Sequence, residues 1–207
     1  MMERTKNDVE AYARNCIMFK LKVIITSTRP GRKGPAIASW VMEETRKHPE
    51  FDPELLDLAV VNLPFMDEPN HPMLLKYEHQ HTRDWSRKIA DADAFIFVTP
   101  EYNFGFTAPF KNAIDYLHHE WKSKPAGIVS YGGVSAGTRS AQMMKQVLTA
   151  VGIMPLYEAV SIPMFGQFLD KEGIFTPNEP LKKGSDAMFA ALARWTKSLQ
   201  EMRANDK

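Results

Sequence analysis

Apolar residues occur along the chain in two kinds of spacing, which predict strands and helices in alternation. Short continuous apolar runs, rich in β-branched or aromatic residues and bounded by turn residues, are typical of strands that are buried on both faces. Such runs predict strands over residues 20–26, 94–99, 126–131 and 155–162, and a weaker strand over residues 58–63.

Between these runs, apolar residues recur at the spacing of an amphipathic helix. We expect helices over residues 35–48, 76–91 and 109–119, around residues 144–151 with Gly152 as the stop, and around residues 188–199. This alternation predicts an α/β fold in which a parallel sheet carries helices on both faces. Five strands fit a flavodoxin-like three-layer sandwich with a five-stranded parallel sheet in the order 2-1-3-4-5.

Composition limits the classes of function. The 207 residues suit one domain over residues 20–207, behind an extension over residues 1–19 that forms either a short helix or a disordered tail. A net charge of +1 without a basic stripe argues against nucleic-acid and membrane partners. The lone Cys16, and the lack of a signal peptide or of the roughly 20 apolar residues that span a membrane, favour a cytoplasmic protein.

Three segments follow the first, third and fourth predicted strands, where doubly wound sheets bind ligands. The first, STRPGRKGP over residues 27–35, offers hydroxyls, arginines and backbone N–H groups at a helix N-terminus, which favours an anion. It matches neither the P-loop pattern nor the pyrophosphate-binding GxGxxG, so a phosphate monoester fits it better. The alternative is a solvated loop that caps the next helix.

The second segment, PEYNFG over residues 100–105, combines an aromatic pair, an amide and a glycine, which can line a flat heterocycle. The third, SYGGVSAG over residues 130–137, has glycines that let the backbone approach a ligand, such as the pyrimidine end of a flavin. The alternatives are a tight turn whose aromatic side chains complete the core, and a flexible loop that leads into the next helix. Phe65 and Met66 are further candidates for the flavin pocket.

Taken in order, STRPGR, then PEYNFGFTAPFKNAIDYL, then SYGG resemble the NADPH-dependent FMN reductase family over about residues 20–160. The resemblance implies a flavodoxin-like fold, bound FMN, a homodimer or a dimer of dimers, and reduction of quinones, azo compounds, free flavin or metal oxyanions. By position, it assigns the phosphate to Ser27 and Arg29, the flavin ring to Pro100, Glu101, Tyr102, Asn103 and Phe104, and the pyrimidine edge to the loop of Tyr131, Gly132 and Gly133. Where family members often carry a second serine or asparagine, this chain has Arg32, Lys33 and Gly34, followed by Pro35.

The sequence therefore predicts an enzyme that oxidises NADPH or NADH and passes the hydride through flavin N5 to a small-molecule acceptor. Since the flavin carries the chemistry, we assign no catalytic side chain. One alternative is a one-electron flavodoxin-type carrier, although flavodoxins are typically strongly acidic and this chain is nearly neutral. The other is an interaction protein that the redox state of FMN switches.

Two further expectations concern metals and partners. His79 and His81 are spaced H-x-H, but no third ligand type lies near them in the sequence, so we expect no metal site. The aromatic residues Phe104, Phe106 and Phe110 crowd one segment, which places residues 102–116 near the interface of the expected homodimer.

Overall fold

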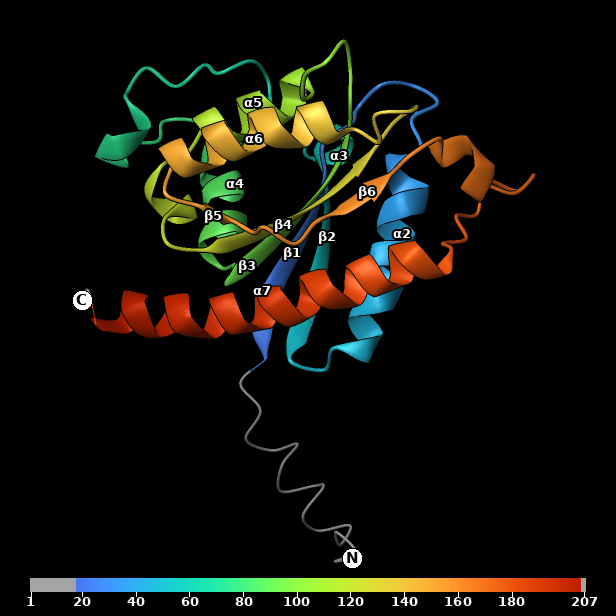
Figure 1. Cartoon of the computed structure of the whole chain (residues 1–207). Coiled ribbons are helices and arrows are strands. Elements are labelled where there is room, and N and C mark those ends of the chain that lie inside the picture. Colours follow the sequence, from blue (N-terminus) through green and yellow to red (C-terminus); the bar gives the residue numbers. More distant parts are fainter. Residues whose placement is uncertain (1–17, 206–207) are drawn as a thin grey trace, which may run out of the picture.

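A parallel β-sheet forms the centre of the computed structural model, which describes residues 18–205, and helices cover both faces of this sheet (Figure 1). The strands are β1 (Phe19–Ile25), β2 (Phe51–Asp57), β3 (Ala94–Pro100), β4 (Pro125–Tyr131), β5 (Met154–Pro155) and β6 (Val160–Ile162). They lie in the order β2-β1-β3-β4-β5, with β6 also paired to β4, and Val23 of β1 faces Leu55 of β2 and Ile96 of β3. The predicted flavodoxin-like order 2-1-3-4-5 is confirmed.

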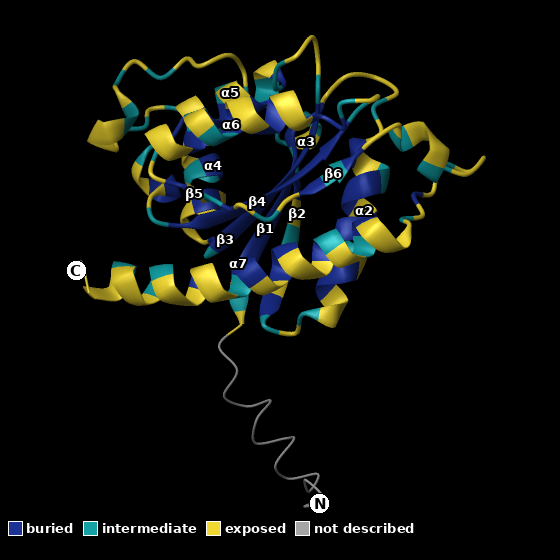
Figure 2. Cartoon of the chain, in the orientation of Figure 1, coloured by how far each residue is buried: buried dark blue, intermediate teal, exposed yellow. Residues whose placement is uncertain are grey.

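Two sets of helices enclose the sheet, and each set forms a separate hydrophobic core with it. The helices are α2 (Gly34–Glu44), α3 (Leu58–Val61), α4 (Gln80–Ala90), α5 (Ala108–Asp115), α6 (Thr138–Ala150) and α7 (Glu179–Asn205), with 3₁₀ turns at Thr45–Lys47, Pro72–Leu74, His119–Trp121 and Phe165–Phe168. Trp40 of α2 and Phe189 of α7 lie in one core, and Trp85 of α4 and Phe110 of α5 lie in the other. Figure 2 shows the resulting layers, with buried strands between helices whose outer faces are exposed.

The second strand differs from the sequence prediction. A strand over residues 58–63 is wrong, because β2 occupies Phe51–Asp57 and Leu58–Val61 forms the short helix α3. Pro53 lies within β2, and the sheet tolerates a proline there because β2 is an edge strand that pairs only with β1. The Asp57 side chain then accepts a hydrogen bond from the backbone N–H of Ala59 at 3.0 Å and so starts α3.

The fifth strand also departs from a single run over residues 155–162. It is divided into β5 and β6, which pair with β4 at Ala126↔Pro155 and Val129↔Val160. Over this stretch the edge strand contains two residues more than β4, and Tyr157 bulges outward with 92% of its surface exposed.

The predicted extension over residues 1–19 lies mostly outside the described residues, and Phe19 already belongs to β1. Within residues 18–205, no helix has both the length and the apolar character needed to cross a membrane.

Candidate functional site

The three segments singled out in the sequence meet at the carboxyl edge of the sheet. The Thr107 hydroxyl donates to the Thr26 carbonyl at 2.8 Å and so joins the segment after β3 to that after β1. The Tyr131 hydroxyl donates to Ser27 Oγ at 3.3 Å, which joins the segments after β4 and β1. The backbone N–H of Glu101 donates to the Tyr131 carbonyl at 3.3 Å, so the three segments form one connected site.

The loop after β1 requires glycine at position 34, where α2 begins. A Cβ atom on Gly34 would lie 2.6 Å from Ser27 Oγ and 2.9 Å from Ile25 Cγ2, so a side chain there would displace the loop from the strand end. Lys33, the N-cap residue of α2, makes no side-chain hydrogen bond that would cap the helix among the described residues. In the described part of the chain, no backbone acceptor pairs with the N–H groups of Thr28, Arg29, Gly31, Lys33 and Gly34. Open N–H groups at a helix N-terminus are the donors that a phosphate group needs.

The two arginines of this loop have different surroundings. Arg32 forms two hydrogen bonds with Asp57, of 2.7 and 2.6 Å, and also donates to the Ser27 carbonyl at 2.8 Å. The hydrogen bonds to Asp57 are the main reason that the pKa of Arg32 lies above its usual value. Arg32 therefore fixes the loop to the end of β2, while the exposed Arg29 lies with its guanidinium 5.9 Å from the centre of the Tyr102 ring. Arg29 is the better placed of the two to meet a ligand.

The segment after β3 folds into a two-residue hairpin turn. Tyr102 and Gly105 exchange backbone hydrogen bonds of 3.0 and 2.9 Å, and both residues between them have positive φ, 49° at Asn103 and 71° at Phe104. This is the geometry of a type I′ turn, for which phenylalanine is an unusual residue. Strain of about 1–3 kcal/mol is typical of such residues and persists only where the surroundings hold them.

The glycine-rich loop after β4 is shaped by backbone contacts. Gly137 has φ of 76°, and a Cβ atom there would lie 2.8 Å from both the backbone nitrogen and oxygen of Tyr131. Gly132 donates its backbone N–H to the Ile162 carbonyl at 3.2 Å, while Gly133 has open space around its α-carbon. The loop thus offers backbone to a ligand at Gly133. Burial raises the pKa of Tyr131 to about 12, so its hydroxyl stays protonated.

The Glu101 side chain is largely buried and pairs with residues of the loop after β4 and of α6. Its carboxylate accepts hydrogen bonds from Ser135 Oγ at 3.2 Å, from the Arg139 backbone N–H at 3.2 Å and from Arg139 Nε at 2.6 Å. Burial raises the pKa of Glu101, but the hydrogen bonds from Arg139 and Ser135 outweigh it and hold the pKa below its usual range. Glu101 therefore connects the hairpin to α6 as a carboxylate.

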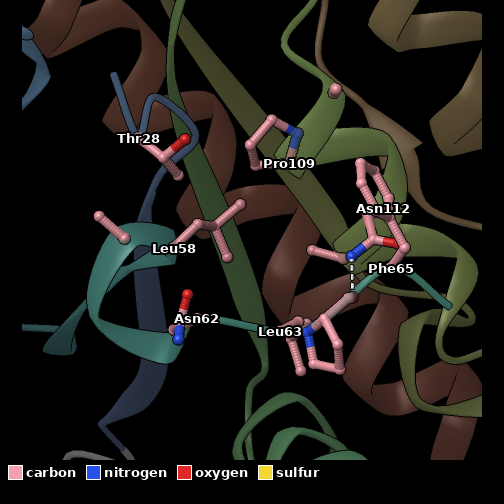
Figure 3. Close-up of a pocket in the computed structure, with 11 residues that line it drawn as sticks. Thr28, Leu58, Asn62, Leu63, Phe65, Pro109 and Asn112 are labelled. Carbon is pink, nitrogen blue, oxygen red and sulfur yellow. Dashed lines mark hydrogen bonds between the residues drawn. The ribbon is translucent and has the colours of Figure 1, made fainter. Parts of the chain in front are cut away.

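A pocket of about 500 Å³ opens beside the loop after β1 (Figure 3). One side of the pocket is formed by α3 and the residues that follow it, and the other side is formed by α5. Its lining consists of Thr28, Leu58, Ala59, Asn62, Leu63, Pro64, Phe65, Ala108, Pro109, Asn112 and Ala113. None of these side chains carries a charge. Phe65, a sequence candidate for the flavin pocket, thus lines this cavity, whereas Met66 does not.

Asn112 of α5 and Tyr116, the residue directly after α5, hold the outer wall of this pocket. Asn112 Nδ2 donates to the Pro64 carbonyl at 2.6 Å, and its Oδ1 accepts from the Met66 backbone N–H at 3.0 Å. The Tyr116 hydroxyl donates to Asp67 Oδ1 at 2.9 Å and lies 3.1 Å from the Pro64 carbonyl. Burial and the bond to Asp67 raise the pKa of Tyr116. These contacts fix residues 64–67 against the helix.

The two histidines spaced H-x-H lie beside this wall. Their rings stack with centroids 5.2 Å apart, and His81 Nε2 lies 2.9 Å from Asp67 Oδ1. Across residues 18–205, no group of three or more histidine, cysteine, aspartate or glutamate side chains is arranged to hold a metal ion.

The residues at this edge fit an FMN group. The open N–H groups of the loop after β1, with Ser27 and Arg29, suit a phosphate, and the aromatic hairpin and the backbone at Gly133 suit a flat ring with an acceptor edge. Pro100 is buried at the end of β3, while Lys33 and Pro35 lie exposed at the start of α2.

Sequence reasoning missed three residues that shape the site. Asp57 escaped notice because its strand was placed seven residues too late. Asn112 lies in the KNAID part of the motif, which was the available signal for its role at the pocket wall. Arg139 has no local signal, because its partner Glu101 is 38 residues away in the chain.

Comparison with known proteins identifies the family. Residues 19–167 match the family model described as NADPH-dependent FMN reductase. An NAD(P)H-dependent FMN reductase of Schizosaccharomyces pombe is 42% identical over 147 residues, which cover 70% of this chain and 74% of that protein. An NADPH:quinone oxidoreductase of Arabidopsis thaliana is 44% identical over 64 residues, covering 30% of this chain and 33% of that protein.

The fold is similar to that of a flavoenzyme NAD(P)H:(acceptor) oxidoreductase of Paracoccus denitrificans, with a TM-score of 0.68 and 21% identity over 87% of this chain and 98% of that one. Together, the comparisons confirm the family resemblance found in the sequence. With it they confirm the predicted enzyme class and the cofactors FMN and NAD(P)H.

Proposed function

Because the chain belongs to the NADPH-dependent FMN reductase family, we propose that it reduces a small, uncharged acceptor of the quinone class at the expense of NAD(P)H. FMN, when bound, supplies the ring atom N5 that takes up and releases the hydride. The protein's own residues bind FMN, orient its ring and select the acceptor. We assign the phosphate to Ser27, Arg29 and the open N–H groups of the same loop, and the ring to the hairpin and the loop of Gly132 and Gly133, where the backbone of Gly133 lies in open space.

The uncharged lining of the pocket beside Thr28 is the observation that carries the choice of acceptor. A metal oxyanion needs cationic or multiple N–H donors, because transferring a charge into an apolar setting without a partner is unfavourable. The pocket instead offers apolar surface, for example from Leu58 and Pro109, and its polar side chains are the Thr28 hydroxyl and the amides of Asn62 and Asn112. Such a lining suits a flat, neutral molecule with carbonyl oxygens.

We also propose that the active form is a homodimer or a dimer of dimers, with residues 102–116 near the interface. Exposed apolar side chains support this proposal, since Phe104 is 65% exposed and Phe65 is 85% exposed at the same edge of the sheet. Light scattering over a range of concentrations tests it, and a monomer mass at every concentration would reject it. A cytoplasmic location remains a prediction from the sequence.

The experiment that tests the acceptor class compares acceptors on one enzyme preparation. The FMN-loaded protein is mixed with NADPH or NADH without oxygen, and reoxidation by a neutral benzoquinone, an azo dye, free riboflavin and chromate is followed by flavin absorbance. We expect rapid reduction by the nucleotide and the highest kcat/KM with the quinone. Faster turnover with chromate would contradict the assignment.

A pair of neighbouring lysine variants sharpens this test. Ala59 lines the pocket, whereas Val60, on the same short helix, does not and is 79% exposed. A positive charge in Ala59→Lys should raise the kcat/KM for an anionic acceptor relative to the quinone by roughly 3- to 10-fold. Val60→Lys is the matched control and should leave this ratio unchanged.

A further inference from the structure

The strained turn of residues 102–105 is held from outside by a side chain of another element. Phe104, in the left-handed region at φ 71°, extends toward α6, where the Arg139 guanidinium lies 4.0 Å from the centre of the Phe104 ring. A cation over an aromatic face at this distance attracts the ring. The contact therefore opposes the tendency of Phe104 to leave its unfavourable backbone conformation.

Arg139 is itself fixed by the residue that precedes the turn. Its backbone N–H and Nε both donate to the Glu101 carboxylate, its Nη2 forms an ion pair with the same group, and Nη2 also donates to Ser135 Oγ at 2.8 Å. The Glu101 side chain is only 6% exposed, whereas half of the Arg139 side chain is exposed. A buried carboxylate thus holds the guanidinium in place over the Phe104 ring.

These contacts close a ring of residues from β3 to α6 and back. Glu101 directly follows β3, Arg139 lies in the first turn of α6, and Phe104 lies on the hairpin that comes after Glu101. On its other side the same hairpin meets Arg29 of the proposed phosphate loop through Tyr102. The hairpin therefore lies between the proposed phosphate site and α6, where its conformation decides how the ring site is approached.

We propose that Arg139 is a positioning residue, which holds Phe104 at the mouth of the ring site so that the nucleotide and the acceptor reach the flavin in a fixed orientation. This proposal rests on the function proposed above. Without Arg139, the turn relaxes, Phe104 samples several positions, and the ring site loses one wall. Because Arg139 acts through Phe104 and does not contact the reacting atoms, its loss affects substrate binding more than it affects hydride transfer.

The first test measures the hairpin without any cofactor. Hydrogen exchange of the apoprotein is followed at the amides of Tyr102 and Gly105 in Arg139→Met, which retains bulk without charge. We expect exchange there to be roughly tenfold faster, with no change in α7. Arg194→Met is the matched control, since Arg194 is an exposed arginine of α7 whose contact with Glu158 is 4.0 Å long. Unchanged exchange in Arg139→Met would overturn the proposal.

The second test uses the loaded enzyme. In Arg139→Met, the KM for NADPH should rise roughly tenfold, while kcat and the dissociation constant of FMN change less than about threefold. Arg139→Lys, which keeps the charge over Phe104 but loses the planar face, should recover part of this effect. Faster exchange without a change in KM would overturn the role in positioning.

A double-mutant cycle separates the turn from general stability. Phe104→Gly removes the strain because glycine adopts positive φ freely, so Arg139→Met in this background should not alter exchange or KM further. An effect of Arg139→Met that persists in full would show that Arg139 acts by another route. The exchange experiment needs no flavin, so it tests the contact even if the proposed acceptor is wrong.

Discussion

The two edges of the sheet use their polar groups in opposite ways. Where β3 and β4 begin, ionisable side chains are hydrogen-bonded within the protein. Lys124 donates to the Ile89 and Ala90 carbonyls at 2.8 and 3.0 Å and closes the end of α4, and Arg203 of α7 pairs with Asp93 at 3.1 Å. Such satisfied groups stabilise the fold and leave little to offer a ligand.

Where the same strands end, donors and aromatic faces are left open. The loop after β1 presents unpaired backbone N–H groups, and Phe104 is exposed on a turn of unfavourable conformation. A protein that departs from local rules at one place and satisfies them elsewhere commonly does so at its functional site. The comparison predicts that changes at the carboxyl edge alter binding, whereas changes at the amino edge alter stability.

The largest effect is expected from Gly34→Ala at the carboxyl edge. The added methyl group would lie 2.6 Å from Ser27 Oγ and push the loop away from the strand end. We expect FMN to bind at least roughly 100-fold more weakly in calorimetry, with a loss of about 1–3 kcal/mol in the free energy of unfolding. Gly166→Ala is the control, because a Cβ there meets nothing within 4 Å. If Gly34→Ala binds FMN with wild-type affinity, the expectation that changes at the carboxyl edge alter binding is wrong.

At the amino edge, Lys124→Met should lower the free energy of unfolding by about 1–3 kcal/mol near pH 9, because the carbonyls of Ile89 and Ala90 lose their donor, and should leave FMN affinity unchanged. Burial, with a smaller contribution from Arg203, lowers the pKa of Lys124 from 10.5 to about 7. Between these values the unfolded chain binds a proton that the folded chain does not, so folded stability rises with pH.

The pH dependence of the stability difference between the wild type and Lys124→Met serves as the control for this prediction. From pH 7 to 10, the stability of the wild type relative to Lys124→Met should increase by up to about 1.4 kcal/mol per pH unit. Denaturant unfolding at several pH values measures it. A difference that is constant with pH would mean that Lys124 is charged in the folded protein.

A third effect separates the two arginines of the phosphate loop. Arg29→Ala should weaken FMN binding by roughly 10- to 100-fold, because a hydrogen bond to a charged group contributes about 1.5–3 kcal/mol. Riboflavin, which lacks the phosphate, is the control ligand. If riboflavin and FMN lose affinity equally, then Arg29 does not contact the phosphate.

The smallest effect concerns the ion pair that fixes the loop. Asp57→Asn weakens the hold on Arg32, so we expect FMN affinity to fall by about 3- to 10-fold through a looser loop. Asp52→Asn, on the same strand but exposed, should have no effect. A tighter complex in Asp57→Asn would indicate that Arg32 binds the phosphate once Asp57 releases it.

The sequence alone determined the alternation of strands and helices and the segments at the carboxyl edge of the sheet, and with the family resemblance it predicted the strand order that the structure has. The apolar run over residues 94–99 is short, rich in aromatic and β-branched residues and followed by a proline, which favours a strand buried on both faces, and alternation with helices favours a parallel sheet. The carboxyl ends of parallel strands share one edge, so the loops after β1, β3 and β4 had to lie near each other. The local pattern placed the second strand wrongly, at residues 58–63. The real strand β2 contains Pro53, which is compatible with a strand only because β2 lies at the edge of the sheet.

Only the tertiary structure decided which side chains act together. Arg32 is a ligand candidate in the sequence, but its pairing with Asp57 depends on how β1 and β2 lie side by side. Glu101 belongs to the predicted ring-binding motif, and its carboxylate accepts a hydrogen bond from Arg139, a partner on another element that the motif does not indicate. Spacing along one strand or helix is set by backbone geometry, whereas contacts between elements depend on packing that no local pattern encodes.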